Sequence, residues 1–286
     1  MRILVVSDIH GNRAALDAIR EPHDVCLCLG DLVEYGPEPA ACIDWVRTHA
    51  HFTVRGNHDH GAAQNVDVVG VSGFRYLTMA TRQGTVRMLS ETDRRFLMDL
   101  PLTRMVTLGG LRFLLVHATP RDPLEEYVGP DPEAWATRLA GVRADFVLVG
   151  HTHYQWLAEV GKVMLLNPGT VGLPRDGNPR ARYAVIEDGV ATLKEVEYDI
   201  EATVAALDRS GFPPEAVRQL AAVYRDGKYT HADGDTHPTG RTGGGERNGQ
   251  VGEGVSQVSA TTSDPTPRPP PRPGEGVFKE ITRLSS

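Results

Sequence analysis

The stretch RGNHD, residues 55–59, follows the short apolar segment FTV, residues 52–54, and sets an amide, an imidazole and a carboxylate side by side. A strand end does not need such a set for its own stability, whereas the loops after strands of open α/β sheets are where ligands bind. A polar turn that only reverses the chain is the alternative, since Gly, Asn and Asp are common turn residues. The ends of the other strands decide between these two interpretations.

The chain has 286 residues, of which 40% are hydrophobic and 23% are charged, and its formal net charge is −7. This composition is typical of a globular protein with one large α/β core or two smaller domains. The acidic balance argues against a nucleic-acid-binding surface, which would carry a basic stripe. The aliphatic run at residues 3–6 is too short for a signal peptide, and no apolar run approaches the ~18 residues of a membrane span. We therefore expect a cytoplasmic protein without membrane contact.

The three cysteines do not form a paired set. Cys26 and Cys28 alternate with apolar residues in a strand-like run, and Cys42 lies in a helical segment. We interpret all three as buried thiols rather than as catalytic or zinc-binding groups.

The first part of the chain alternates between strands and helices. Residues 2–7 form an aliphatic run typical of a central parallel strand. Further strands are predicted at 25–29 and 52–54, with helices at about 13–20 and 40–48 between them. This β-α-β-α-β order with short loops predicts parallel pairing and right-handed crossovers.

Residues 61–100 show helical spacing and no clear strand, and Pro101 ends the last helix. Because this insertion follows the RGNHD stretch directly, it either overhangs the site as a lid or forms a plain packing subdomain. Beyond it, the sequence predicts the following elements: a hairpin of 105–108 with 111–116, a helix at 132–139, strands at 146–149 and 163–166, a hairpin of 183–186 with 190–196, and helices at 200–209 and 214–224.

The folded domain is predicted to span residues 1–225. Residues 226–286 are rich in Gly and Pro and poor in apolar side chains, a composition typical of a disordered tail. Within the tail, residues 265–273 favour polyproline II, either as a spacer or as a ligand for a protein partner that the sequence does not identify.

Five predicted strands end in residues that can bind a metal ion. In chain order, these residues are Asp8 with His10, Asp31, Asn57 with His58, His117, and His151 with His153. If the strands lie in one or two stacked sheets, all of these groups converge on one edge. Carboxylate, imidazole and amide donors without thiolate suit Mn²⁺, Fe²⁺, Zn²⁺ or Ni²⁺. Seven candidate ligands among these eight residues suit two ions that share one carboxylate, and two ions can clamp a phosphate and activate a water.

The same residues resemble a known family. Asp8-x-His10, Gly30-Asp31, Gly56-Asn57-His58-Asp59, His117 and Gly150-His151-x-His153, in this order, are similar to the signature of the calcineurin-like metallophosphoesterases. The resemblance covers residues 1 to about 200. It implies an α/β fold with four layers, α-β-β-α, in which helices flank two mixed β-sheets and the site lies at the strand ends.

The resemblance also implies a role for each residue. Asp8, His10, Asp31 and His153 would bind the first metal, and Asp31, Asn57, His117 and His151 the second. Manganese is our first choice for both ions, with iron, zinc or nickel as alternatives. His58 would be the general acid, oriented by Asp59, and a metal-bridging hydroxide would be the nucleophile. Gly56 is expected to let the backbone turn tightly.

One departure separates the chain from the phosphoprotein phosphatases. Tyr35 stands where that branch has a phosphate-holding arginine, and the segments 30–39, 117–123 and 167–177 instead resemble compact prokaryotic phosphodiesterases similar to diadenosine tetraphosphatases. Arg121 and Arg175 in these segments are candidate phosphate ligands, because a guanidinium suits bidentate contact with phosphate. The alternative is that each arginine pairs with a neighbouring Asp in its own loop.

Two functions are consistent with the sequence. The first is a dinuclear-metal phosphoesterase that hydrolyses a small phosphodiester, phosphomonoester or nucleotide. The second is a metal-dependent regulatory protein that binds a nucleotide or a partner without significant turnover, which the proline-rich tail suggests. His58 favours the first, because metal binding alone does not require it.

Overall fold

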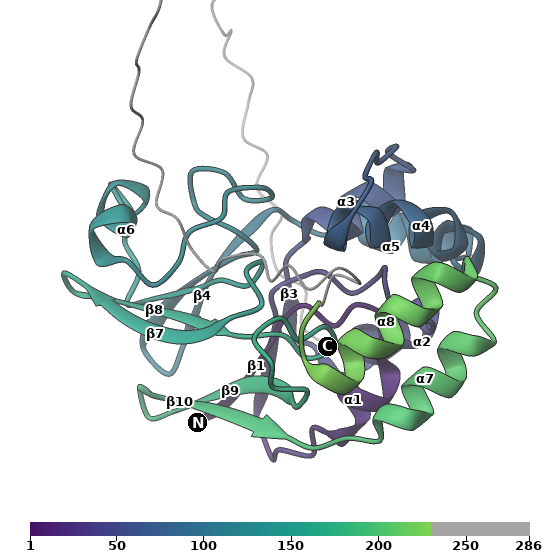
Figure 1. Cartoon of the computed structure of the whole chain (residues 1–286). Coiled ribbons are helices and arrows are strands. Elements are labelled where there is room, and N and C mark those ends of the chain that lie inside the picture. Colours follow the sequence, from purple (N-terminus) through teal and green to yellow (C-terminus); the bar gives the residue numbers. More distant parts are fainter. Residues whose placement is uncertain (230–286) are drawn as a thin grey trace, which may run out of the picture. The chain divides into compact units, whose positions relative to one another are not determined.

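The computed structural model describes residues 1–229 of the chain. Within these residues the strands form two five-stranded sheets (Figure 1). Sheet A has the order β10-β9-β1-β2-β3 and consists of β1 (Arg2–Val6), β2 (Val25–Cys28), β3 (Phe52–Thr53), β9 (Ala181–Glu187) and β10 (Val190–Val196). Strands β1, β2 and β3 pair in parallel, whereas β9 pairs antiparallel with β1 and β10. The predicted parallel unit and the second predicted hairpin are confirmed.

Sheet B has the order β4-β5-β6-β8-β7 and consists of β4 (Thr103–Leu108), β5 (Leu111–Val116), β6 (Phe146–Leu148), β7 (Gln155–Val160) and β8 (Val163–Pro168). The predicted β4-β5 hairpin is confirmed. The sequence did not predict β7, which lies at the sheet edge and pairs antiparallel with β8. The sequence of β7 is QWLAEV, in which only three consecutive residues are apolar, so it lacks the longer apolar run of a central strand.

The alternation of side chains along β1 explains how the layers stack. Ile3 and Val5 pack in the cluster between the two sheets, where Phe113 of sheet B also lies. Leu4 and Val6 point to the other face, against the helices that cover sheet A. The outer face of sheet B packs against Trp135 of a helix in the cluster that contains Val147. Helices, two sheets and a further helix therefore form four layers, and the predicted fold class is confirmed.

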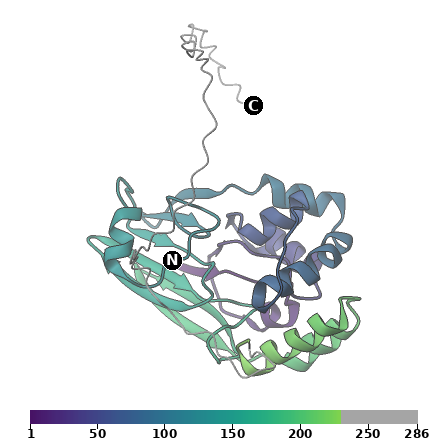
Figure 2. The ribbon, with the colours of Figure 1, turned by 45° about the horizontal axis from the view of Figure 1, so that its top comes forward.

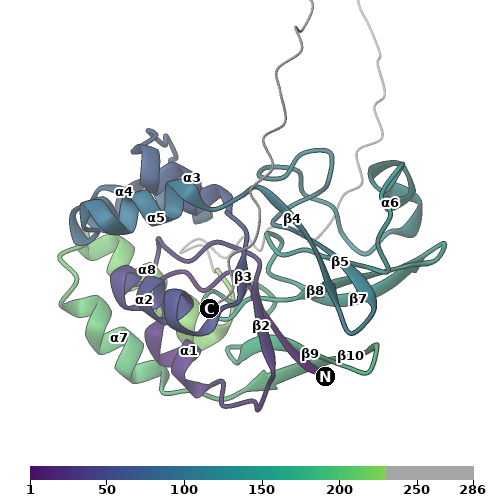
Figure 3. The same cartoon turned by 180° about the vertical axis from the view of Figure 1, so that it is seen from behind.

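The helices lie in three groups. Those that accompany sheet A are α1 (Arg13–Ala18), α2 (Pro39–His49), α7 (Ile200–Asp208) and α8 (Pro214–Asp226). Helix α6 (Pro132–Arg138) lies beside sheet B, on the side away from α7 and α8 (Figure 2). The third group is the insertion, which consists of α3 (Asn57–Gln64), α4 (Gly73–Met88) and α5 (Glu91–Asp99) and lies next to α2 and α8 (Figure 3).

The insertion packs against the loop after β2. The Tyr35 hydroxyl lies 2.7 Å from the hydroxyl of Thr78, and the Tyr35 backbone N–H donates to Thr81 at 3.4 Å. The helical character predicted for 61–100 is confirmed, although the first helix already begins at Asn57. These contacts are those of a packing subdomain, and movement as a lid stays a prediction.

Three further expectations concern the whole chain. None of the helices in residues 1–229 is long and apolar enough to cross a membrane. The three cysteines are free and buried, as predicted. The predicted disordered tail, residues 226–286, lies outside the described residues except for 226–229.

Candidate metal centre

The loops at the carboxyl ends of β1, β2, β3, β5 and β6 bring the predicted ligands together. They form two groups of buried residues: Asp8, His10 and His153 in one, and Asp31, His117 and His151 in the other. In each group, one ligand atom per residue lies within 4.8 Å of the others. Asn57 adjoins the second group, since its side-chain oxygen lies 3.2 Å from Nε2 of His117. The convergence expected from the strand ends is therefore present.

The backbone at these ligands is strained. Five of them have φ angles in the left-handed region: Asp8 (54°), His10 (48°), Asp31 (55°), His151 (65°) and His153 (65°). Residues other than glycine rarely adopt this conformation, which costs about 1–3 kcal/mol each and persists only where the surroundings enforce it. A loop that merely reverses the chain gains nothing from this repeated strain. The strain therefore indicates a functional site.

The two histidines of the first group, His10 and His153, face each other through Nε2 atoms that carry lone pairs. Nδ1 of His10 lies 3.0 Å from the carbonyl oxygen of Val33, and Nδ1 of His153 lies 2.6 Å from that of Leu173. Because a carbonyl oxygen only accepts, both Nδ1 atoms carry the proton and both Nε2 atoms are left as acceptors. These two Nε2 atoms are 3.2 Å apart. Burial holds the pKa of both imidazoles well below its ordinary value, so a metal ion suits this position better than a proton.

Asp31 lies between the two groups. Its Oδ2 atom is 3.2 Å from Nε2 of His117 and 3.7 Å from Nε2 of His10. Nδ1 of His117 donates to the carbonyl oxygen of Leu29 at 2.8 Å, so its Nε2 also faces the centre. The carboxylate thus has the position of a bridging ligand, and the two groups fit a dinuclear metal site with oxygen and imidazole donors.

The charges in the centre shift the pKa values of its acidic and basic groups. Burial raises the pKa of Asp8 to about 6. Burial also acts to raise the pKa of Asp31, but the charges of His117 and His58 outweigh it and hold that pKa well below its ordinary value. Burial acts to lower the pKa of His117, whereas its interactions with Asp31 raise it to about 9. A metal ion would replace this proton, so metal binding and protonation compete.

His58 is held beside the centre by a buried carboxylate. It is 7% exposed, and its Nδ1 lies 2.5 Å from Oε2 of Glu34. Its Nε2 lies 4.0 Å from Oδ2 of Asp31. Arg82 of α4 donates from Nε and Nη2 to the two oxygens of Glu34. The imidazole is therefore fixed with one nitrogen on Glu34 and the other toward the ligands.

The expected role of Asp59 as the group that orients His58 is wrong. The Asp59 carboxylate accepts from the backbone N–H groups of Asp31 and Leu32, both at 2.8 Å, and of Gly56 at 3.0 Å. Because His58 and Asp59 are consecutive residues of helix α3, their side chains are rotated by about 100° from each other and point in different directions. Asp59 instead fixes the loop that carries Asp31.

The expected role of Gly56 in a tight turn is also wrong. Its φ of −90° and ψ of 172° are ordinary extended values. A Cβ atom at this position would lie 2.0 Å from Oδ1 of Asp31. Glycine is therefore required for space, because the chain passes directly over the bridging carboxylate.

The two candidate phosphate ligands have different surroundings. The half-buried Arg175 lies over the ring of Phe74, with its guanidinium carbon 4.4 Å from the ring centre. Its charge adds to burial in lowering the pKa of His58 and of His153, so it lies near the centre. Arg121 is 61% exposed and pairs with Glu126. Arg121 therefore has an acidic partner in its own loop, although this partner is a glutamate and not the aspartate of the alternative.

Sequence reasoning missed three residues of the site: Glu34, Arg82 and Tyr127. Glu34 had a detectable signal, since an acidic residue three positions after Asp31 lies in the quoted loop, and its φ of 73° adds to the strain there. Arg82 had none, because a single arginine in a helix is usually solvated. The ring of Tyr127 lies 3.9 Å from that of His151, centre to centre.

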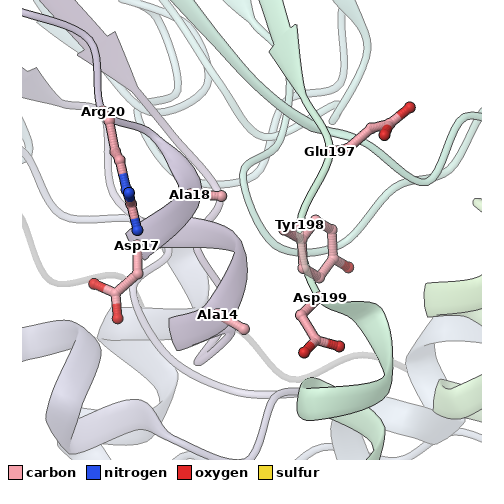
Figure 4. A pocket seen from close by; sticks show the side chains of 7 residues that line it. All are labelled: Ala14, Asp17, Ala18, Arg20, Glu197, Tyr198 and Asp199. Carbon is pink, nitrogen blue, oxygen red and sulfur yellow. The ribbon is translucent and has the colours of Figure 1, made fainter.

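A separate surface pocket of about 360 Å³ lies between α1 and the segment that joins β10 to α7 (Figure 4). Its lining consists of Ala14, Asp17, Ala18, Arg20, Glu197, Tyr198 and Asp199. None of these is a candidate ligand. Asp17 pairs with Arg13 at 2.8 Å, and Asp199 caps α7 by accepting from Ala202 at 2.9 Å. Two of its carboxylates are thus already engaged in stabilising helices.

The fold and the centre together define a class of protein. A family model described as the calcineurin-like phosphoesterase superfamily domain matches residues 1–188. The chain belongs to this superfamily and is a phosphoesterase, a hydrolase that acts on phosphoric ester bonds. The resemblance inferred from the motifs is confirmed.

Individual relatives refine this placement. The phosphodiesterase YfcE of Escherichia coli is 26% identical over 212 residues, which cover 68% of this chain and 91% of YfcE. An uncharacterised protein of Methanocaldococcus jannaschii is 30% identical over 239 residues, which cover 74% of this chain and 93% of that protein. The chain is thus related to small prokaryotic phosphodiesterases of the YfcE type.

Solved structures share the fold. The metallophosphoesterase of Sphaerobacter thermophilus superposes with a TM-score of 0.65 at 31% identity, covering 78% of this chain and 98% of that one. A hypothetical protein of Pyrococcus horikoshii has a TM-score of 0.68 at 21% identity, covering 77% and 97% of the two chains. The second similarity concerns the fold alone.

Proposed function

We propose that this protein hydrolyses a small phosphodiester or nucleotide at the dinuclear centre, with His58 as the general acid. The observation that carries the proposal is the position of Asp31 between the two ligand groups, 4.0 Å from Nε2 of His58. An imidazole at this place is dispensable for metal binding but suited to proton transfer to a leaving group.

Each residue of the centre has a task in this proposal. Asp8, His10, Asp31 and His153 would hold one ion, and Asp31, Asn57, His117 and His151 the other. When bound, two divalent ions, manganese first among the candidates, supply Lewis-acid chemistry that neutralises the phosphoryl oxygens and lowers the pKa of a water. The donors are buried, which supports the proposal because electrostatic interactions strengthen where water is excluded.

His58 donates its proton to the leaving alkoxide from Nε2, because Nδ1 is engaged by Glu34. Glu34 is a positioning residue: its carboxylate holds Nδ1 and so turns Nε2 of the ring toward the centre. Arg82 donates to both oxygens of Glu34 and so holds this carboxylate in place behind the ring.

Arg175 is the proposed phosphate ligand. Its Nε atom is buried and has no hydrogen-bond partner among the described residues. A planar guanidinium with a free N–H suits the oxygens of a phosphate. The stacking of Arg175 on Phe74 fixes the plane of the group before a substrate binds.

Two observations favour small phosphodiesters over phosphoproteins. Tyr35, which stands where the phosphoprotein phosphatases have an arginine, is 2% exposed and bonded to Thr78, so this position offers no cation. The relative YfcE is named a phosphodiesterase.

The proposal is tested with the full chain loaded with Mn²⁺. Hydrolysis is measured on bis-p-nitrophenyl phosphate, p-nitrophenyl phosphate, cyclic nucleotides and dinucleoside polyphosphates, with metal content determined on the same sample. We expect two metal ions per chain and turnover of at least one diester. A protein that holds two ions but cleaves none of these substrates would overturn the proposal and favour a metal-dependent binding protein.

A further inference from the structure

Tyr127 is an exposed aromatic residue beside the centre. Its ring lies 3.9 Å from the ring of His151, at an interplanar angle of 39°. The residue is nevertheless 60% exposed. The ring therefore contacts His151 while more than half of the residue remains accessible to solvent.

The loop that carries Tyr127 is braced. The neighbouring Glu126 accepts from Thr119 at 2.6 Å and from Arg138 at 2.7 Å. The carbonyl oxygen of Glu125 lies 3.3 Å from Nε2 of His151. An aromatic ring on a fixed loop loses little conformational entropy when it binds a ligand.

Tyr127 also interacts with the proposed phosphate ligand. Burial acts to lower the pKa of Arg175, but its interactions with Tyr127 and Tyr35 raise it above its ordinary value. The guanidinium and the tyrosine ring are therefore neighbours at the edge of the centre. A group that binds phosphate lies next to a flat apolar face.

We propose that Tyr127 is a stacking platform for the planar part of the substrate, so that the site takes a nucleotide whose base stacks on this ring. The inference rests on the proposed function and adds the substrate class to it. A phosphate at the centre, held by Arg175, directs its ester group toward the adjacent tyrosine. Stacking on an aromatic side chain tolerates every base, because each base has a π-face. A base of any identity therefore fits.

The alternative is that Tyr127 only holds the ring of His151 in position and does not contact the substrate. Under that alternative, replacing Tyr127 affects all phosphate ligands equally. Under the stacking proposal, the loss is confined to ligands that carry a base. Two ligands that differ only in the presence of a base therefore distinguish these two hypotheses.

The experiment uses adenosine 5′-monophosphate and ribose 5-phosphate, which share the sugar and the phosphate. Calorimetry measures the dissociation constant of each for the full chain loaded with Mn²⁺, in wild type, Tyr127→Phe and Tyr127→Leu. We expect the wild type to bind the adenosine compound at least about fivefold more tightly, since base stacking corresponds to about 5- to 150-fold in affinity. Tyr127→Phe keeps this ratio, and Tyr127→Leu brings it to within about twofold of unity.

The ratio within each variant cancels any general damage to the centre. A wild-type ratio near one, or an unchanged ratio in Tyr127→Leu, would overturn the stacking proposal. Hydrolysis of bis-p-nitrophenyl phosphate is assayed in parallel to separate the two proposals. Turnover without a base preference would support the proposed function and contradict the stacking role of Tyr127. A base preference without turnover would support the stacking role and contradict the proposed function.

Discussion

Arg82 and Glu34 form an ion pair across 48 residues of sequence, inside the protein, and this pair stands directly behind His58. Arg82 is 5% exposed and Glu34 is fully buried. Arg82 of α4 thereby contributes to the centre through Glu34 and His58, although it is not itself a candidate metal ligand. A buried pair of this kind is sensitive to the loss of either partner, because the other is left as an unpaired charge.

The first prediction concerns the stability of this pair. Arg82→Met and Glu34→Gln should each lower the free energy of unfolding by about 3–5 kcal/mol, and the double variant should lose less than the sum of the two. Urea unfolding of the four proteins measures this coupling. The matched control is Arg225→Met, which removes an exposed pair with Glu201 and should leave the free energy of unfolding nearly unchanged. Additive single effects would show that the pair is not coupled.

The second prediction concerns proton donation. His58→Ala should lower kcat by about 100- to 10,000-fold on diphenyl phosphate, whose leaving group is a poor one, and by much less on bis-p-nitrophenyl phosphate. The reason is that p-nitrophenolate is already a stable anion and gains less from a proton. Metal analysis should find two ions in this variant, in contrast to Asn57→Ala, which should lose metal. An equal loss on both substrates would contradict the acid role.

The third prediction concerns the space above the bridging carboxylate. Gly56→Ala places a Cβ atom 2.0 Å from Oδ1 of Asp31, so Asp31 must move. We expect the metal content to fall below two ions per chain and activity to fall about 10- to 100-fold, as for other changes that displace a metal ligand indirectly. The control is Gly129→Ala, where a Cβ atom meets nothing within 4 Å. Full metal content in Gly56→Ala would refute the explanation given for this glycine.

The fourth prediction is a pH dependence of stability at Glu21. Burial acts to raise the pKa of this carboxylate, but hydrogen bonds from Arg2, Lys194 and Tyr183 lower it to about 2. Because the ordinary pKa of about 4.3 applies in the unfolded chain, the unfolded state binds more protons below that pH. The stabilisation is therefore complete above about pH 4.3 and is lost as the pH falls toward about 2.

Glu21→Gln tests this. Its free energy of unfolding should lie about 1 kcal/mol below that of the wild type at pH 7, and the difference should shrink between about pH 4.3 and about pH 2. Chemical denaturation at several pH values measures it. Glu91→Gln, at an exposed pair, should change stability by less than about 0.5 kcal/mol at pH 7. A difference that stays constant over the acidic range would be inconsistent with the lowered pKa.

The sequence by itself determined the parallel unit of sheet A, the two hairpins and the seven candidate ligands. These depend on local patterns: side chains alternate along each strand, and each ligand follows its strand within a few residues. The ends of parallel strands lie on one edge, so a list of strand ends already predicts which groups converge. The edge strand β7 was not predicted, because its apolar residues form only a short run.

Only the tertiary structure decided which groups surround the ligands. In the structure, His58 contacts Glu34 and not Asp59. Asp59 accepts from the backbone of the loop that carries Asp31. Arg82 lies in the interior, where it donates to Glu34. These contacts join segments far apart in the chain, and they depend on where helix α3 begins and on how the insertion packs. Local periodicity carries no information about such distances, whereas packing fixes them, because a buried charge is stable only where a partner of opposite charge meets it.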